Sequence, residues 1–290
     1  MVLYYAMGGG LGHLVRARAV LHTLRLERGA ALLSASPHAR DPRVVGALPV
    51  HQPPEALRDD VSAVAAWVVD TITRLDPGEL IVDAFPAGLL GELRLLRAPP
   101  AITYVARLLR WSAYAPLALG SPLRFERALV LEDLLPEHAA FTAMAAAKVE
   151  PLALRDPPAL PAATPVPALP ARFSLVVHAG DDGEITELVA YARELGARDG
   201  RTPGAAPEPV LVCRPGPASS ALAGASTIDL HPPTALFAGA TRIVTACGFN
   251  VMRQLAPLSA KHSFLPFPRR YDDQYTRAAR ARARSRGVAR

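Results

Sequence analysis

A histidine follows a glycine-rich turn near the start of the chain. Residues 7–13 read Met-Gly-Gly-Gly-Leu-Gly-His, between an apolar run at 2–6 and a segment of helical periodicity. A strand end, a glycine turn and a helix start gather backbone N–H groups at one point and favour an anion there. We therefore expect Gly10 and Gly12 to approach a phosphate, with the imidazole of His13 beside it as a base. The alternative is a tight turn in which His13 only caps the helix.

The same run excludes two common nucleotide sites. A dinucleotide fingerprint requires G-x-G-x-x-G and an acidic residue after the second strand. Here His13 occupies the third glycine position, and the second strand ends in Ser-Ala-Ser-Pro at 34–37. The sequence also has no G-x-x-x-x-G-K-[ST], no H-E-x-x-H and no Asp-x-Asp. Neither a nucleoside triphosphatase loop nor a metal site is predicted.

A second strand, glycine and helix sequence lies late in the chain. The apolar run at 242–246 is followed by Cys247 and Gly248, and Phe249 and Asn250 open the next helical segment. Free N–H groups at this helix start would point at an anion, aided by the helix dipole. The segment thus predicts a second anion-binding turn.

Composition and charge limit the class of protein. The 290 residues are half apolar and one-fifth charged, as in a globular protein with room for two domains. The net charge of +6 comes almost wholly from arginine, since Lys148 and Lys261 are the only lysines. We expect no nucleic-acid partner. The arginines within 269–290 are interpreted first as a solvated helix face and second as a peripheral contact with an anionic membrane surface.

No apolar stretch approaches the roughly 20 residues that span a bilayer. A cytoplasmic protein is therefore expected, at the inner membrane surface if the second interpretation of the arginines holds. Cys213 and Cys247 are far apart in strand-like runs, which predicts buried thiols rather than a disulfide or a metal pair. Abundant alanine, proline and arginine are typical of a GC-rich, bacterial genome.

Short apolar runs alternate with amphipathic stretches in two successive blocks, which favours parallel sheets flanked by helices. The first block covers 1–150, and prolines recur through 151–172, where we predict a linker. The second block covers 173–290. Strands are expected in the first block at 2–6, 30–35, 80–83 and 101–105, with a long helix at about 55–75. Strands are expected in the second block at 173–178, 210–213, 226–230 and 242–246, with a helix at 184–195 and a loop at 200–209.

Four segments, in order, carry a resemblance to a known family. They are Gly-Gly-x-Gly-His at 9–13, Asp-Ala-Phe-Pro-Ala-Gly-Leu-Leu-Gly-Glu at 83–92, Cys-Gly-Phe-Asn at 247–250 and Asp-Asp-Gln at 272–274. The chain resembles a GT-B glycosyltransferase of the family 28 type, which includes the peptidoglycan N-acetylglucosaminyltransferase. Residues 12–16, Gly-His-Leu-Val-Arg, are also similar to the nucleotide-sugar hydrolase of pseudaminic acid synthesis.

The resemblance implies an α/β protein of GT-B type, with two Rossmann-like domains facing a cleft. The first domain would bind an acceptor, of unknown identity, and the second a nucleotide-diphosphate sugar, without a metal or other cofactor. The second glycine turn then becomes the better diphosphate site, and the first turn delivers His13 across the cleft. The residues implied in donor binding are Gly180 and Asp181 beside the nucleotide, Gly248, Phe249 and Asn250 at the diphosphate, Gln254 at the ribose, and Asp273 and Gln274 at the donor sugar.

His13 is the expected catalytic base, because an imidazole with a pKa near 6.5 accepts a proton at neutral pH. Asp83 ends a strand of the same domain and is expected to orient His13 or to bind acceptor hydroxyls; its alternative role is a helix cap before Pro86. Two departures bear on activity: Gln254 replaces a glutamate usual in the family, and the chain ends soon after the Asp-Asp-Gln segment. Three functions therefore stay open: sugar transfer, nucleotide-sugar hydrolysis with His13 activating water, and nucleotide-sugar binding without catalysis.

Overall fold

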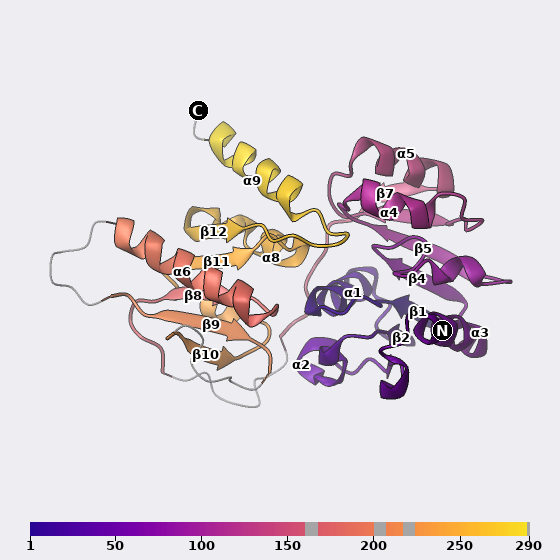
Figure 1. Ribbon diagram of the computed structural model, residues 1–290, viewed down its shortest axis with the longest axis horizontal. Coiled ribbons are helices and arrows are strands. Elements are labelled where there is room, and N and C mark those ends of the chain that lie inside the picture. Colours follow the sequence, from indigo (N-terminus) through magenta and orange to yellow (C-terminus); the bar gives the residue numbers. More distant parts are fainter. Residues whose placement is uncertain (160–167, 200–206, 217–223, 289–290) are drawn as a thin grey trace. The chain divides into compact units, whose positions relative to one another are not determined.

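The computed structural model describes residues 1–159, 168–199, 207–216 and 224–288 (Figure 1). It divides into two compact units. Unit 1 comprises Met1–Pro158 and Arg270–Asp273, and unit 2 comprises Ala159–Arg269 and Gln274–Arg290. The first division falls inside the stretch predicted as a linker, of which residues 160–167 lie outside the described residues. Residues 270–273, which lie within the block predicted as the second domain, group with unit 1.

Unit 1 contains a parallel sheet of seven strands in the order β3-β2-β1-β4-β5-β6-β7. Helices cover both of its faces (Figure 1). The order reverses between β1 and β4, so these neighbours flank the point where parallel α/β sheets bind ligands. The strands are β1 (Val2–Tyr5), β2 (Ala30–Leu33), β3 (Val50–His51), β4 (Glu79–Asp83), β5 (Ala101–Ala106), β6 (Arg127–Val130) and β7 (Val149–Pro151). The helices are α1 (Leu11–Leu24), α2 (Pro42–Val45), α3 (Val61–Leu75), α4 (Trp111–Ala118) and α5 (Pro136–Ala145), with short 3₁₀ turns η1 (Pro37–Arg40), η2 (Glu55–Leu57) and η3 (Glu92–Leu95).

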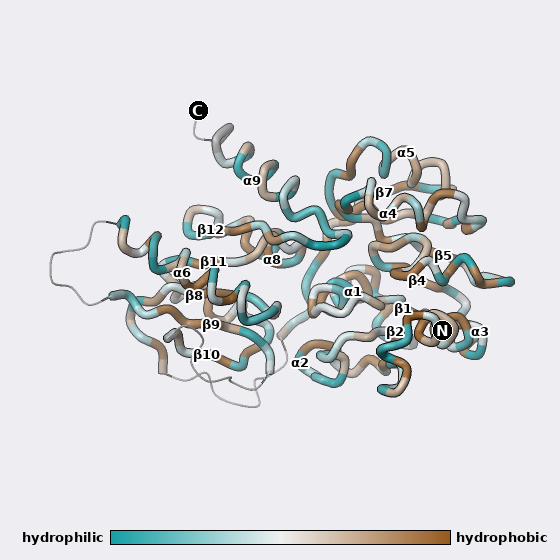
Figure 2. Tube along the Cα trace, in the orientation of Figure 1, coloured by the Kyte–Doolittle hydropathy of each residue, from teal (hydrophilic) through white to brown (hydrophobic). Residues whose placement is uncertain are grey.

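Side chains alternate across the unit 1 sheet and build a core on each face. On one face, Tyr5 and Val82 pack in one cluster with Ile72 of α3. On the other face, Tyr4 packs with Leu14 of α1. These cores fix α1, and hence the helix start at His13, against the sheet. Figure 2 shows hydrophobic stretches along the strands that carry them.

The structure differs from the predictions for this half in one helix and three strands. The helix expected at 55–75 begins at Val61, because Asp60 caps it through the amides of Ser62 and Ala63. Strands β3, β6 and β7 were not predicted. The strand β3 has two residues and β7 has three, the latter ending in Pro151 inside the expected linker, so neither has a readable alternation.

Unit 2 contains a parallel sheet of five strands in the order β10-β9-β8-β11-β12. The order reverses between β8 and β11, the two strands that precede the predicted donor turns. The strands are β8 (Ser174–Val177), β9 (Val210–Arg214), β10 (Ser226–Asp229), β11 (Arg242–Ala246) and β12 (His262–Leu265). The helices are α6 (Asp182–Arg198), α7 (Thr234–Phe237), α8 (Phe249–Gln254) and α9 (Gln274–Val288), with the 3₁₀ turn η4 (Ala256–Lys261). Most of the loop expected at 200–209 lies outside the described residues.

Two further expectations can be placed. Cys213 and Cys247 are both buried, as predicted. Across the ranges described above, no helix is both long and apolar enough to cross a membrane.

The core of unit 1 contains a buried histidine that makes stability depend on pH. The ring of His138 stacks on Trp111, with centroids 4.4 Å apart. Its Nε2 lies 2.8 Å from the hydroxyl of Tyr104, which itself donates to the carbonyl of Ala84. Burial, aided by the charge of Arg107, lowers the pKa of His138 to about 4. His138 is therefore neutral in the folded protein at neutral pH.

We expect the free energy of unfolding of unit 1 to fall by about 3 kcal/mol as the pH drops from 6.5 towards 4. The folded-state pKa of His138 is depressed, so the unfolded chain takes up the proton first and gains stability as the pH falls. Urea unfolding followed by tryptophan fluorescence measures this, since both tryptophans, Trp67 and Trp111, lie in unit 1. The variant His138→Phe keeps a stacked ring and should lose this part of the pH dependence. An equal slope in both proteins would contradict the prediction.

Candidate active site

His13 and Asp83 meet at the carboxyl ends of β1 and β4. Asp83 is the last residue of β4, and His13 lies in the first turn of α1, whose N-cap is Gly10. The Nδ1 atom of His13 lies 2.5 Å from Oδ2 of Asp83. The Asp83 side chain is fully buried, whereas that of His13 is 12% exposed. The two residues that the sequence singles out for catalysis are thus in direct contact, and their catalytic role stays a prediction.

Asp83 is also bound by two other side chains. Arg16, one turn after His13 on α1, donates from Nε to Oδ1 and from Nη2 to Oδ2, each at 2.6 Å. The hydroxyl of Tyr4 donates to Oδ1 at 3.2 Å. Burial by itself raises the pKa of Asp83, but the charge of Arg16 and the hydrogen bonds from His13 and Arg16 outweigh it and hold the pKa well below its usual range. Asp83 is therefore an anion at every pH at which the protein would work.

This arrangement sets the tautomer of His13. An ionised carboxylate only accepts hydrogen bonds, so Nδ1 of His13 carries the proton and Nε2 keeps its lone pair. The Arg16 Nη2 atom is also 3.2 Å from Nδ1; both atoms are then donors, so this contact is one of charge and not a hydrogen bond. Burial lowers the pKa of His13, and Asp83 only partly offsets this. The imidazole is neutral at pH 7 and can act as a base through Nε2.

The glycine run leaves room for the imidazole. A Cβ atom on Gly8 would overlap the His13 ring, whereas one on Gly9 or Gly10 would meet no atom within 4 Å. On another side, the ring of Phe85 lies 5.5 Å from that of His13. The absence of a side chain at Gly8 is therefore what lets the ring lie against the turn.

A second ion pair, which the sequence does not reveal, lies in the same unit. Arg107 directly follows β5, is almost fully buried and pairs with Asp272. The neighbouring Tyr271 is buried against Phe85 and Tyr114, at centroid distances of 5.6 and 5.2 Å. The carbonyl of Tyr271 accepts from the amide of Arg110 at 2.8 Å. Residues 270–273 thus dock beside the His13 site, and the predicted donor residue Asp273 belongs to this unit.

In unit 2, the helix start after β8 is filled by carboxylates of the protein. Asp181 caps α6 by accepting from the amide of Glu184 at 2.9 Å. Asp182 pairs with Arg214 at 2.7 Å. The carboxylate of Glu184 accepts from both Arg269, at 2.5 Å for one of the two contacts, and His178, at 2.6 Å. The acidic residues beside Gly180 are therefore engaged in capping and ion pairing.

A Cβ atom on Gly180 would run into His178 and Glu184, so glycine is required there by packing. Burial lowers the pKa of His178, and the hydrogen bond and charge of Glu184 only partly offset this.

The turn after β11 differs from the turn after β8. Gly248 is the N-cap of α8, no side chain caps this helix, and its first turn has no acidic residue. A Cβ atom on Gly248 would meet nothing within 4 Å. Phe249 and Asn250 open the helix, and Gln254 is its last residue. Of the turns after β8 and β11, the second is thus the one whose N-cap glycine has open space beside it and whose helix has no side-chain cap.

Gln274 forms a hydrogen bond with the backbone at the start of this turn. Its Oε1 atom accepts from the amide of Cys247 at 3.2 Å and from the amide of Phe267 at 3.1 Å. Arg277, one turn later on α9, donates to the carbonyl of Cys247 at 2.8 Å. Gln274 therefore joins the ends of β11 and β12, a role that the sequence does not indicate.

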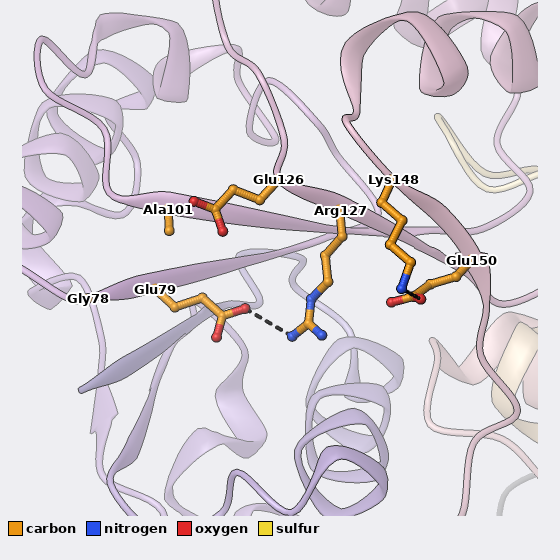
Figure 3. A pocket seen from close by; sticks show the side chains of 7 residues that line it. All are labelled: Gly78, Glu79, Ala101, Glu126, Arg127, Lys148 and Glu150. Atoms are coloured by element: carbon orange, nitrogen blue, oxygen red, sulfur yellow. Dashed lines mark hydrogen bonds and ion pairs between the residues drawn. The ribbon is translucent and has the colours of Figure 1, made fainter.

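A separate cavity of about 470 Å³ lies near the amino ends of the unit 1 strands (Figure 3). Its lining includes Glu79 and Arg127, the first residues of β4 and β6, which pair at 3.2 Å. Lys148 and Glu150 pair on its other side at 2.5 Å. The cavity is at the amino ends of the strands, whereas His13 and Asp83 are at the carboxyl ends, so it is not part of the site.

Comparison with known proteins gives a fold and no family model. No family model matches the chain, and no curated protein matches it. Among solved structures, the glycotransferase of kitacinnamycin has a TM-score of 0.58 at 14% identity, over 97% of this chain and 83% of that one. The spinosyn rhamnosyltransferase SpnG, complexed with thymidine diphosphate, has a TM-score of 0.54 at 16% identity, over 97% and 84%. The glycosyltransferase SnogD from Streptomyces nogalater has a TM-score of 0.53 at 16% identity, over 92% and 81%. With its two parallel-sheet α/β units, the chain has the GT-B fold of these glycosyltransferases.

Proposed function

We propose that this protein is a glycosyltransferase that moves a sugar from a nucleotide-diphosphate sugar to an acceptor hydroxyl, with His13 as the general base. The observation that carries the proposal is the 2.5 Å contact between Nδ1 of His13 and Asp83, which leaves Nε2 as the proton acceptor. The fold supports it, because the three solved structures described above are glycosyltransferases. The bound thymidine diphosphate of one of them supports a nucleotide-diphosphate donor.

The proposed step is a substitution at the anomeric carbon of the donor sugar. Nε2 of His13 takes the proton of the acceptor hydroxyl as that oxygen forms its bond to the anomeric carbon. The bond from the anomeric carbon to the β-phosphate oxygen breaks, and its electron pair leaves with the nucleoside diphosphate. Asp83 stabilises the imidazolium that forms and stays ionised throughout, since it is already held as an anion.

The leaving diphosphate requires donors that are in place before the reaction. We assign this role to the turn of Gly248, Phe249 and Asn250, whose helix start has no side-chain cap and no acidic residue in its first turn. Gly10 and Gly12 would contribute in the same way from α1, whose first turn also lacks acidic residues. This proposal uses backbone amides and helix dipoles, and it includes no metal or other cofactor.

The remaining donor contacts follow the sequence predictions. Gly180 and Asp181 would border the nucleotide and Gln254 would hydrogen-bond the ribose. Asp273 and Gln274 would contact the donor sugar. Because Oε1 of Gln274 already accepts two backbone amides, the Nε2 amide group is the part of Gln274 that we assign to the sugar.

The test is a panel of nucleotide-diphosphate sugars offered to the purified protein, first by thermal shift and then by assay of nucleoside diphosphate release. We expect at least one donor to raise the melting temperature, because binding to the folded state alone stabilises it. Its turnover should require an added acceptor. Release of free sugar without an acceptor would replace transfer by hydrolysis, and no binding to any donor would refute the proposal.

A single methyl group next to the base should test its placement. We expect Gly8→Ala to lower kcat by about 10²-fold, because the added Cβ displaces the His13 ring and a misplacement of about 1 Å costs that much. Gly9→Ala is the matched control, since a Cβ there meets no neighbour, and it should retain activity. Steady-state kinetics with the donor from the panel measures both variants. Equal activity of the two would contradict the placement.

A further inference from the structure

The side chain of Arg16 contacts the side chains of both members of the proposed base. It lies on α1, three residues after His13, so the two side chains emerge on the same face of the helix. Its guanidinium binds both oxygens of Asp83 at 2.6 Å, and its Nη2 atom lies 3.2 Å from Nδ1 of His13. The Arg16 side chain is only 4% exposed. Solvent therefore screens its charge little.

We propose that Arg16 is a positioning residue for the His13 base, which fixes the plane of the Asp83 carboxylate and balances its charge so that His13 stays neutral until it takes a proton. This inference rests on the proposed function for the role of His13. It assigns Arg16 no contact with the donor or the acceptor.

The geometric part follows from the shape of the guanidinium. Two parallel N–H groups of one rigid fork bind the two carboxylate oxygens and fix their plane. Oδ2 is then aimed at Nδ1 of His13, 2.5 Å away. A single ammonium group would hold the charge of Asp83 but not its orientation.

The electrostatic part follows from the charged and titratable groups that act on His13 or on Arg16 within the described residues. Asp83 on β4 and Asp272 on the 270–273 segment are negative, and Arg16 on α1 and Arg107 after β5 are positive; Tyr4 on β1 is neutral. These charges cancel while the imidazole is neutral. An unbalanced Asp83 would favour the imidazolium, which has no lone pair to accept a proton. The charge of Arg16 indeed lowers the pKa of His13, in the same direction as burial.

A purely structural ion pair between α1 and β4 would explain the same contacts. The two roles differ in the titration of His13, because only the proposed role makes that titration depend on Arg16. The deciding measurement is therefore the pKa and tautomer of His13 by ¹⁵N nuclear magnetic resonance. The His13 signals are identified by their loss in His13→Gln, and no catalysis is required.

In the unaltered protein we expect Nε2 unprotonated at pH 7 with the proton on Nδ1. In Arg16→Met, the pKa of His13 should rise by about one unit or more, and the acid limb of kcat/KM should move by the same amount. Arg18→Met on the same helix is the matched control, since Arg18 has no contact with Asp83 recorded in the described residues, and it should leave both unchanged. A folded Arg16→Met with an unshifted His13 titration would overturn the proposal.

If Arg16→Met does not fold, the variant Arg16→Lys tests the positioning role instead. It keeps the charge, so the His13 titration should stay in place, and it loses the fork, so kcat should fall about tenfold with KM unchanged. An unchanged kcat would overturn the positioning role. A protein whose His13 titrates as expected but transfers no sugar would instead refute the proposed function, so the two failures are distinguishable.

Discussion

Replacing His13 with glutamine is expected to lower kcat by about 10²- to 10⁴-fold, the usual contribution of a general base. Glutamine keeps polarity and approximate length but cannot take a proton at neutral pH. Donor affinity should stay nearly unchanged, because the proposed donor contacts come from backbone turns and from other side chains. Steady-state kinetics and a thermal shift with the same donor measure the two effects separately.

The matched control is His22→Gln, a histidine near the other end of α1 whose partner is Glu27 at 3.1 Å. It should have the activity of the unaltered protein. If His13→Gln retained its activity while binding the donor, the base would be another group, and the assignment of the His13 and Asp83 pair to catalysis would be wrong.

Replacing Asp83 with asparagine should have a comparably large effect for a different reason. An asparagine NH₂ group facing Nδ1 would donate to it, so the imidazole proton would move to Nε2 and the base would lose its lone pair. A loss of about 10⁴-fold in kcat is the expected order of magnitude for such a change of tautomer. The variant also leaves Arg16 as a buried charge without its carboxylate, which costs about 3–5 kcal/mol of stability.

The double variant Asp83→Asn with Arg16→Met separates the two consequences. It removes the unpaired charge, so unfolding followed by tryptophan fluorescence should show much of the stability restored. Its activity should remain low, because the wrong tautomer persists. Activity within tenfold of the unaltered protein in Asp83→Asn would show that the tautomer of His13 does not matter for turnover.

The sequence predicts the contact of His13 with Asp83 for a physical reason. Both residues come at the ends of readable apolar strands, and the carboxyl ends of neighbouring parallel strands meet at one edge of a sheet. The glycine turn before His13 and the turn at Gly248 are recognisable for the same reason. Strands β1, β2, β4 and β5 are long enough, and apolar enough, to be read without the structure.

Other parts of the site depend on contacts that leave no local pattern. Arg107 and Asp272 are 165 positions apart, and each taken alone is an ordinary charged residue. Arg16 lies in the Gly-His-Leu-Val-Arg segment, but its burial and its bonds to Asp83 depend on the packing of α1 against β4. Gln274 was singled out as a sugar contact, but its bonds to two backbone amides depend on how β11, β12 and α9 meet. Such contacts follow from tertiary packing, which the hydrophobic periodicity of the sequence does not reveal.

The four residues 270–273 bear on how this protein can be divided and recombined. Tyr271 is nearly fully buried in unit 1, yet the residues on either side of the segment belong to unit 2. A gene fragment ending at residue 158 would therefore encode unit 1 without Tyr271, the ring that packs against Phe85 and Tyr114. Exchange of whole halves between relatives would have to preserve this tetrapeptide together with the surface that receives it. A recombined protein that keeps unit 1 intact therefore has to inherit residues 1–158 together with residues 270–273.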